Sequence, residues 1–172
     1  MTAAGLLIAS GLAAPLAMAA GCLWPGFRLR AIGWIWAAPI PALLAALFAR
    51  GGGIVMSPDP LRLTLALDDV GAMLLGGAAL LWSAAGVYAA SYLRGKPGIE
   101  GFAVWWLLTL AGSLGTFMVA DMTSFYLAFS VASLSAYGLV SFETTARAKR
   151  AGDVYMALAL LGEAFILSLI HI

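Results

Sequence analysis

Charged residues are scarce in this sequence, and their scarcity argues against a soluble protein. Only 10% of the 172 residues are charged and 63% are hydrophobic, whereas a soluble domain averages about 25% charged and about 45–50% apolar residues. The mean hydropathy is +1.01. A soluble fold of this length has too little interior to enclose so much apolar surface. The composition therefore predicts an integral membrane protein.

Residues that hold metals, phosphates or nucleic acids are also nearly missing. The chain has one cysteine, Cys22, and one histidine, His171, and it contains no glycine-rich phosphate loop ending in Gly-Lys-Ser/Thr. Its formal net charge of +1 offers no basic field to a nucleic acid. We expect no catalytic residue, no cofactor, no metal and no nucleic-acid partner on this chain. Cys22 is interpreted as a small apolar filler.

Long apolar runs occupy most of the chain. A membrane-spanning helix needs about 20 apolar residues to cross about 30 Å of hydrocarbon, and open strands cannot satisfy their backbone in lipid. The expected fold class is all-α, a polytopic transmembrane helix bundle with five complete spans and a truncated sixth that begins near Val154. The five spans are Thr2 to Trp24, Ala31 to Ala49, Val70 to Leu93, Gly101 to Ala120 and Met122 to Phe142.

The connections between these spans are short and rich in glycine and proline. They include Pro25-Gly26, Gly51-Gly52-Gly53, Pro58-Asp59-Pro60 and Gly95-Lys96-Pro97-Gly98. A cleaved signal peptide is not expected at the start. No Lys or Arg precedes Arg28, and the first apolar run has the full length of a span.

The nine basic residues fall mainly in alternate loops. Only Arg50 and Arg62 lie in the even-numbered loops, and the other seven lie in loops one, three and five: Arg28, Arg30, Arg94, Lys96, Arg147, Lys149 and Arg150. Cytoplasmic loops carry the excess of Lys and Arg. The pattern predicts a multi-pass protein whose basic side is cytoplasmic and whose N-terminus is outside.

The predicted fifth span carries polar side chains spaced three or four residues apart, which places them on one face of a helix. They are Thr123, Tyr126, Ser130, Ser133, Tyr137 and Ser141. Two interpretations remain open: a face that packs against another helix, or the lining of a hydrated route for an ion. Thr109, Gly112, Ser113 and Thr116 of the preceding span form a similar face of small residues, for which packing is favoured.

Acidic residues stand at span boundaries, with one exception. Asp121 precedes the fifth span, and Asp68 and Asp69 precede the third, where a carboxylate caps a helix N-terminus. Glu163 lies ten residues beyond Asp153, about 15 Å into the sixth span and close to the bilayer midplane. An ionised carboxylate there costs at least about 2.5 kcal/mol without a partner, so Glu163 is a candidate for proton transfer.

Two stretches carry a family resemblance. Residues 121–140, DMTSFYLAFSVASLSAYGLV, and residues 151–164, AGDVYMALALLGEA, resemble the start of the proton-conducting core of the antiporter-like membrane subunits. That family includes the large pumping subunits of respiratory complex I, the membrane subunits of energy-converting hydrogenases and the large subunits of multisubunit sodium/proton antiporters. The segments Leu67-Asp68-Asp69 and Ser91-Tyr92-Leu93 extend the resemblance upstream.

The resemblance implies an N-terminal fragment of a proton-translocating subunit. It implies a cell inner membrane location, other membrane subunits as partners, and protons or sodium ions as the transported species. Such a subunit would belong to a complex like NADH:quinone oxidoreductase or a hydrogenase, with no redox or hydrolytic site on this chain. One departure is Ser130, which stands where pumping members carry a membrane-embedded glutamate. Glu163 is the candidate to take over that titratable role.

We expect three parts along the chain. Residues 1–120 would hold the N-terminal helices, and residues 121–166 the start of the conducting core. The last six residues, LSLIHI, match one reading frame of a transposon end used in sequencing-library preparation. Residues 167–172 are therefore expected to be a non-native tail, and His171 is assigned no role.

Two other functions stay open. The chain could be a non-conducting structural or assembly subunit of such a complex, in which the polar face of the fifth span only packs. It could also be an unrelated small-solute transporter or a multi-span membrane enzyme.

The predicted topology is testable without knowledge of the function. Because basic loops stay cytoplasmic, reporter fusions or cysteine labelling at residues 28–30, 94–96 and 147–150 should all report cytoplasm. Labelling at residues 51–59 should report the outside. A cytoplasmic location of that loop would contradict both the charge argument and the family resemblance.

Overall fold

The computed structural model describes residues 2–55, 63–95, 99–143 and 145–171, and these residues are mostly helical. A short 3₁₀ helix, η1 (Ile35–Ala37), and two strands, β1 (Gly53–Val55) and β2 (Thr64–Ala66), accompany the helices. The helices are α1 (Ala3–Gly21), α2 (Pro25–Ala31), α3 (Ile40–Phe48), α4 (Asp69–Tyr92), α5 (Ile99–Thr116), α6 (Met122–Val140) and α7 (Ala146–His171).

Four described helices are long and apolar enough to cross a membrane: α1, α4, α6, and α7 as far as Leu169. The apolar segments Gly101–Thr116 and Ile35–Phe48 are shorter. The helical membrane architecture is therefore confirmed, while the expected count of five complete spans is not. Helix α7 begins at Ala146 rather than near Val154, so the span expected to be truncated reaches full length.

The prediction of one continuous helix from Ala31 to Ala49 was wrong. Helix α2 ends at Ala31, η1 follows, and α3 starts afresh at Ile40. Pro39 and Pro41 have no backbone N–H, so an unbroken helix would lose hydrogen bonds at both. Pro41 instead lies in the first turn of α3. A backbone N–H in the first turn has no acceptor within the helix, so proline costs no hydrogen bond there.

The all-α expectation also missed a small antiparallel hairpin. Strand β1 pairs with β2 in the register Gly53↔Ala66, Ile54↔Leu65 and Val55↔Thr64. The turn between α5 and α6 adds to it through hydrogen bonds from Ala66 N to Met118 O at 2.7 Å and from Ala120 N to Thr64 O at 3.0 Å. The hairpin thus ties the chain after α3 to the entry of α6. The loop expected at Pro58-Asp59-Pro60 lies outside the described residues.

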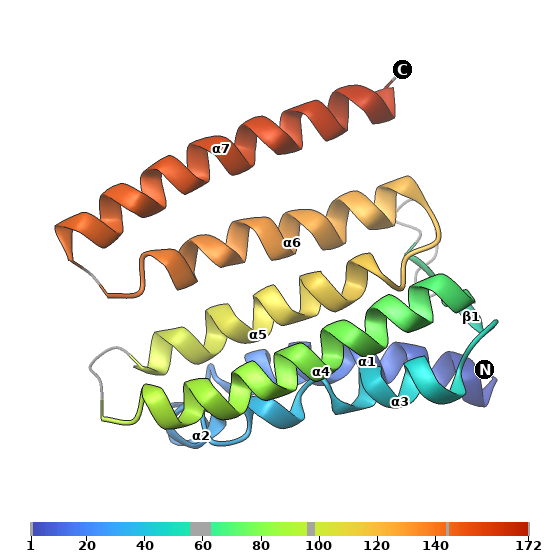
Figure 1. Ribbon diagram of the computed structural model, residues 1–172, viewed down its shortest axis with the longest axis horizontal. Coiled ribbons are helices and arrows are strands. Elements are labelled where there is room, and N and C mark those ends of the chain that lie inside the picture. The colour runs from blue at the N-terminus through green and yellow to red at the C-terminus, as the bar shows by residue number, and fades with distance from the viewer. Residues whose placement is uncertain (1, 56–62, 96–98, 144, 172) are drawn as a thin grey trace.

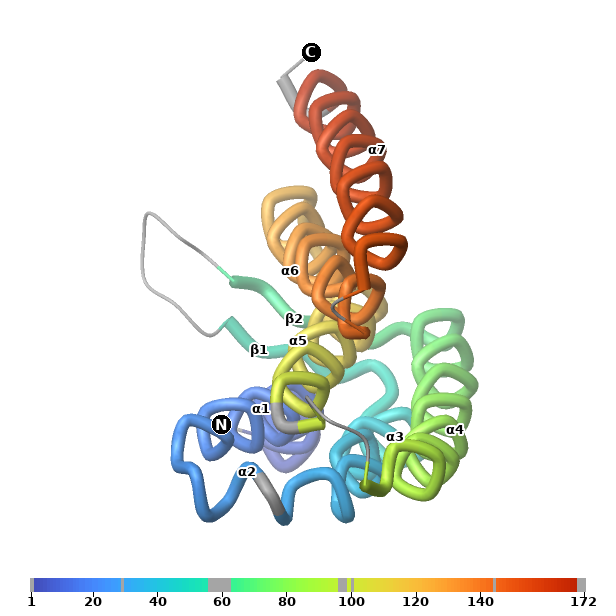
Figure 2. The backbone as a smooth tube through the Cα atoms, turned by 90° about the vertical axis from the view of Figure 1, so that its left-hand side faces the viewer, coloured from blue at the N-terminus to red at the C-terminus, as the bar shows by residue number. Residues whose placement is uncertain are grey.

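Helices α5, α6 and α7 lie side by side in a row (Figures 1 and 2). Figure 1 shows α4, α5, α6 and α7 running in alternate directions along the long axis of the bundle, and Figure 2 shows α7 at the edge of the bundle with α6 between it and α5. Helices α1, α3 and α4 lie on the far side of α5. Buried leucine and alanine side chains of α1, α3, α4 and α5 form most of the core.

Most described basic residues gather at one end of the bundle, which we call the basic end. Arg28 and Arg30 lie in α2, Arg94 follows α4, and Arg147, Lys149 and Arg150 lie in the first turns of α7. Arg50 lies at the opposite end, the hairpin end, next to β1. Lys96 and Arg62 lie outside the described residues. The structure therefore keeps the charge asymmetry that the sequence shows.

Helix α6 packs most closely against α5, through glycines. A Cβ atom added at Gly112 would overlap the backbone nitrogen of Ala132, and one added at Gly138 would overlap the indole of Trp105. Between these two points the hydroxyls of Thr109 and Ser135 lie 3.0 Å apart. Small residues allow such approach between membrane helices, and here they fix which side of α6 faces α5.

Adding one methyl group to this contact should separate the two helices. Gly112→Ala should destabilise the protein by about 1–3 kcal/mol because the new Cβ overlaps the backbone of α6. Gly101→Ala is the matched control on the same helix. Its Cβ meets no described atom within 4 Å, and alanine is the better helix former by about 1 kcal/mol. Apparent melting temperatures in detergent measure both, and equal effects would contradict the packing described.

Candidate functional site

The polar face of α6 lies against α7. A Cβ atom added at Gly152 of α7 would lie 2.9 Å from Tyr137 Cε2 and 3.2 Å from Ser141 Cβ. One turn further along α7, the Tyr155 hydroxyl donates a hydrogen bond to the carbonyl oxygen of Ser133 at 3.0 Å. Three members of the predicted stripe therefore contact α7, while the opposite side of α6 packs on α5.

Glu163 lies in the same interface. Its side chain is 6% exposed, and among the described elements α6 is the one that α7 packs against extensively. Glu163 follows Gly152 by eleven residues, or three helical turns, so both point to the same side of α7. That side faces α6.

The antiparallel register sets the level of Glu163 along α6. Three turns forward from Gly152 on α7 correspond to three turns backward on α6 from Tyr137 and Ser141. Eleven residues before these two positions are Tyr126 and Ser130. The carboxyl of Glu163 therefore lies level with the Tyr126–Ser130 segment of the stripe.

Two polar atoms at this level have no hydrogen-bond partner among the described residues. They are Ser130 Oγ and Glu163 Oε1, and both are buried. Other serines of α6 behave differently. Ser141 Oγ donates to the carbonyl oxygen of Tyr137 at 2.8 Å, and Ser135 Oγ donates to that of Val131. Because buried polar groups are nearly always paired, the unpaired atoms distinguish Ser130 and Glu163 from the packing serines.

The hairpin end of α6 is closed by Asp121. Its carboxylate accepts hydrogen bonds from Ser124 N at 2.8 Å and from Ser124 Oγ at 2.7 Å, and Ser124 Oγ accepts one from Thr64 N at 3.2 Å. These hydrogen bonds from Ser124 lower the pKa of Asp121. Thr123 is exposed beside it. Asp121 thus serves as the N-cap of α6, and on α4 that place belongs to Asp68, with Asp69 in the first turn.

The face of small residues on α5 serves as a packing surface at the positions whose contacts are described. Gly112 and Thr109 face α6, and Thr116 Oγ1 donates to the carbonyl oxygen of Ser113 within its own helix. Among the described residues no group of three or more His, Cys, Asp or Glu could hold a metal ion. The polar α6–α7 interface is therefore the candidate site.

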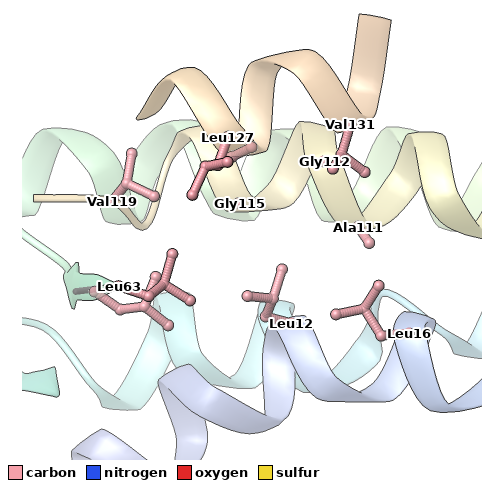
Figure 3. Close-up of a pocket in the computed structure, with 11 residues that line it drawn as sticks. Leu12, Leu16, Leu63, Ala111, Gly112, Gly115, Val119, Leu127 and Val131 are labelled. Atoms are coloured by element: carbon pink, nitrogen blue, oxygen red, sulfur yellow. The ribbon is translucent and has the colours of Figure 1, made fainter. Parts of the chain in front are cut away.

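A cavity on the other side of α6 contrasts with this interface. It has a volume of about 140 Å³ and lies between α1, β2, α5 and α6. Figure 3 shows Leu12, Leu16 and Leu63 on one side of it, facing Leu127 of α6 and the glycines of α5 on the other side. It is lined by Leu12, Leu16, Leu63, Leu65, Ala111, Gly112, Gly115, Val119, Leu127, Ala128 and Val131. A wall without polar side chains offers no hydrogen bonds to water or ions.

Sequence reasoning missed the residues of α7 that form the interface. Gly152 and Tyr155 carry the contacts with α6, whereas Gly162, which lies next to Glu163, does not. A Cβ atom at Gly162 would meet no described atom within 4 Å. The available signal was the spacing of Gly152, Tyr155, Ala159 and Glu163, which repeats every three or four residues.

The chain was compared with protein families, with curated proteins and with solved structures. No family model matches the sequence. Over 87 residues the chain is 36% identical to NADH-quinone oxidoreductase subunit N of Desulforudis audaxviator (strain MP104C). The matched segment covers 49% of this chain and 17% of that protein. The fold of this chain is similar to a chain of the membrane-bound sulfane sulfur reductase, an archaeal respiratory membrane complex.

That structural likeness has a TM-score of 0.76 at 20% identity and covers 94% of this chain and 35% of the other. In both comparisons the chain spans much less than two thirds of the relative's length. The resemblance predicted from residues 121–164 is confirmed by these two findings.

Proposed function

We propose that this chain, which resembles the antiporter-like membrane subunits in sequence and fold, is the N-terminal part of a proton-translocating subunit of a respiratory or hydrogenase-type membrane complex. The relatives' names support a place in a respiratory membrane complex. Other membrane subunits of that complex would be its partners, and residues 121–166 would begin its conducting core.

Glu163 is the observation that carries the proposal. It is a buried carboxyl group on the side of α7 that also contacts the hydroxyl-bearing stripe of α6. Ionisable residues inside membrane segments are costly and usually mark ion or proton pathways. A carboxyl group can bind and release a proton, and the hydroxyls of α6 can pass hydrogen bonds toward it.

The stripe on α6 has the length that such a pathway needs. From Thr123 at the hairpin end to Ser141 at the basic end it covers eighteen residues, or about 27 Å at the helical rise. The hydrocarbon core is about 30 Å thick. Glu163, level with Tyr126 and Ser130, would receive and deliver protons within this line, with Ser133 and Tyr137 between it and the basic end.

We place the protein in the cell inner membrane with the basic end in the cytoplasm. The described basic residues Arg28, Arg30, Arg94, Arg147, Lys149 and Arg150 share that end, as the positive-inside rule requires. The N-terminus, which lies at the hairpin end (Figure 1), would then be outside.

A non-conducting structural subunit is the second candidate, and specific observations favour it. Ser130 stands where the pumping relatives carry glutamate, and the Tyr155–Ser133 hydrogen bond shows that the stripe makes packing contacts. In that case the Glu163 carboxyl would serve only to join α6 and α7.

Replacing Glu163 separates the two candidates. Glu163→Gln keeps the size and hydrogen-bonding ability but cannot ionise, so proton transport by the full-length protein in its complex should fall by about 10²-fold. Asp153→Asn, an exposed carboxylate on the same helix, is the matched control and should transport normally. A pH-sensitive dye in sealed vesicles measures transport, and native gels measure assembly. Undiminished transport by an assembled Glu163→Gln protein would leave the structural candidate standing.

A further inference from the structure

We infer that a hollow at the basic end of the bundle binds a zwitterionic phospholipid, with the ammonium group of the lipid held against aromatic rings and Glu143. The aromatic walls of the hollow, its one carboxylate and its level in the membrane carry the inference. It goes beyond the proposed function, because lipid binding at this place does not depend on proton transport.

The hollow lies where four helix ends meet. It has a volume of about 390 Å³, which falls in the range of about 300–1,000 Å³ that small-ligand sites occupy. The end of α4, the start of α5, the end of α6 and the start of α7 form it, and Figure 1 shows these four ends together at the basic end. We call it the aromatic hollow, after the residues that give it its chemistry: Tyr88, Tyr92, Phe102, Trp106, Phe142 and Glu143.

The rings of the aromatic hollow hold one another in place. The ring of Phe102 contacts those of Trp106 and Phe142, with centroid distances of 5.5 Å and 5.3 Å. On α4, Tyr88 and Tyr92 stack with their centroids 5.5 Å apart and their planes 13° apart. Trp106 is buried, whereas Tyr88 and Tyr92 are 67% and 56% exposed, so the tyrosines are open to a ligand. Side chains that are already ordered lose little conformational entropy when a ligand binds.

The charge of the aromatic hollow selects the ligand group. Among the described residues that line it, Glu143 alone carries a charge, and its side chain is exposed. The face of an aromatic ring is electronegative, so it attracts a cation placed against it. A carboxylate beside such rings adds to that attraction and repels an anion. An ammonium group is therefore the ligand group that the hollow favours.

Two arginines flank the aromatic hollow and suit a phosphate. Arg94 directly follows Leu93 and Arg147 directly precedes Ala148, and both Leu93 and Ala148 line the hollow. The two arginine side chains are exposed. A guanidinium group binds phosphate through paired hydrogen bonds. A zwitterionic headgroup joins an ammonium to a phosphate through a short linker, so it can place the ammonium in the hollow and the phosphate at the arginines.

The level of the aromatic hollow favours a lipid over a soluble amine. Tyrosine and tryptophan gather at the level of lipid headgroups, and Tyr92 is the last residue of α4 at the basic end. Deeper in the bilayer, Leu81 and Leu74 continue the face of Tyr88 at intervals of seven residues, and they are 73% and 48% exposed. Acyl chains can lie along this apolar face below the headgroup, whereas a soluble amine would leave it uncovered.

Photolabelling of the full-length protein in its complex tests the inference. The probe is a phosphatidylethanolamine with a photoreactive group near its phosphate, added in detergent micelles. It should label peptides that line the aromatic hollow, residues 85–93 and 139–143. Unlabelled phosphatidylethanolamine should compete better than phosphatidylglycerol, which has a phosphate but no ammonium. Mass spectrometry of the digested protein measures the site and the extent of labelling.

Exposed side chains of the aromatic hollow can be changed without disturbing the core. Glu143→Gln should reduce labelling by about threefold, because the carboxylate is lost. Tyr88→Leu should reduce it by about fivefold, because the attraction between ring and cation is lost. Asp153→Asn and Trp34→Leu are the matched controls, since they remove an exposed carboxylate and an exposed ring that lie outside the hollow. Both controls should label like the wild type.

Three results would overturn the inference. Unchanged labelling in both Glu143→Gln and Tyr88→Leu would show that the hollow does not hold the headgroup. Equal competition by phosphatidylethanolamine and phosphatidylglycerol would show that the basic end binds phosphate without an ammonium site. Absence of label at the hollow, together with cross-linking of Tyr88→Cys to another subunit by a thiol reagent, would show that a protein covers this surface. None of these results changes what proton transport by Glu163→Gln shows about the proposed function.

Discussion

The contact between α5 and α6 at Gly112 and Gly138 fixes the rotation of α6 about its axis, and with it the face that α6 presents to α7. Backbone and indole atoms approach so closely there that α6 cannot turn about its axis without a clash. The polar stripe lies on the opposite side of α6, so the rotation that buries the glycines also presents the hydroxyls to α7. Helix packing in lipid, where no hydrophobic force drives association, depends on such fits between small residues.

Both sides of α6 carry serine, so residue type does not distinguish them. The hydrogen bonds that these serines make do distinguish the two sides. Ser135, on the α5 side, bonds to Thr109 and to its own helix, so its bonding capacity is used within the packed pair. On the α7 side, Ser130 Oγ is buried and has no hydrogen-bond partner among the described residues, and the same holds for Glu163 Oε1 of α7. The serine in the α5–α6 contact therefore has its hydroxyl hydrogen-bonded, whereas the hydroxyl of Ser130 is left unpaired.

The sequence predicted the local features and missed those that depend on distant partners. The spacing of three and four residues from Thr123 to Ser141 identified the polar face of α6, but nothing in that spacing says which helix it meets. The hairpin pairs residues 53–55 with residues 64–66, and the turn at 118–120 then bonds to residues 64–66. No local pattern reveals the second pairing. Pro39 and Pro41, which interrupt the segment, stand in the sequence, but the span from Ala31 to Ala49 was predicted from its apolar length alone.

The central claim is that the stripe of α6 and Glu163 of α7 face each other, and thiol cross-linking measures this most directly. In a Cys22→Ala background, Ser130→Cys combined with Glu163→Cys should join rapidly on oxidation or with a short bifunctional thiol reagent, provided the protein assembles. The adjacent pair, Val131→Cys with Glu163→Cys, should react slowly, because Val131 lines the apolar cavity on the other side of α6. Equal rates for the two pairs, or faster cross-linking through position 131, would contradict the account.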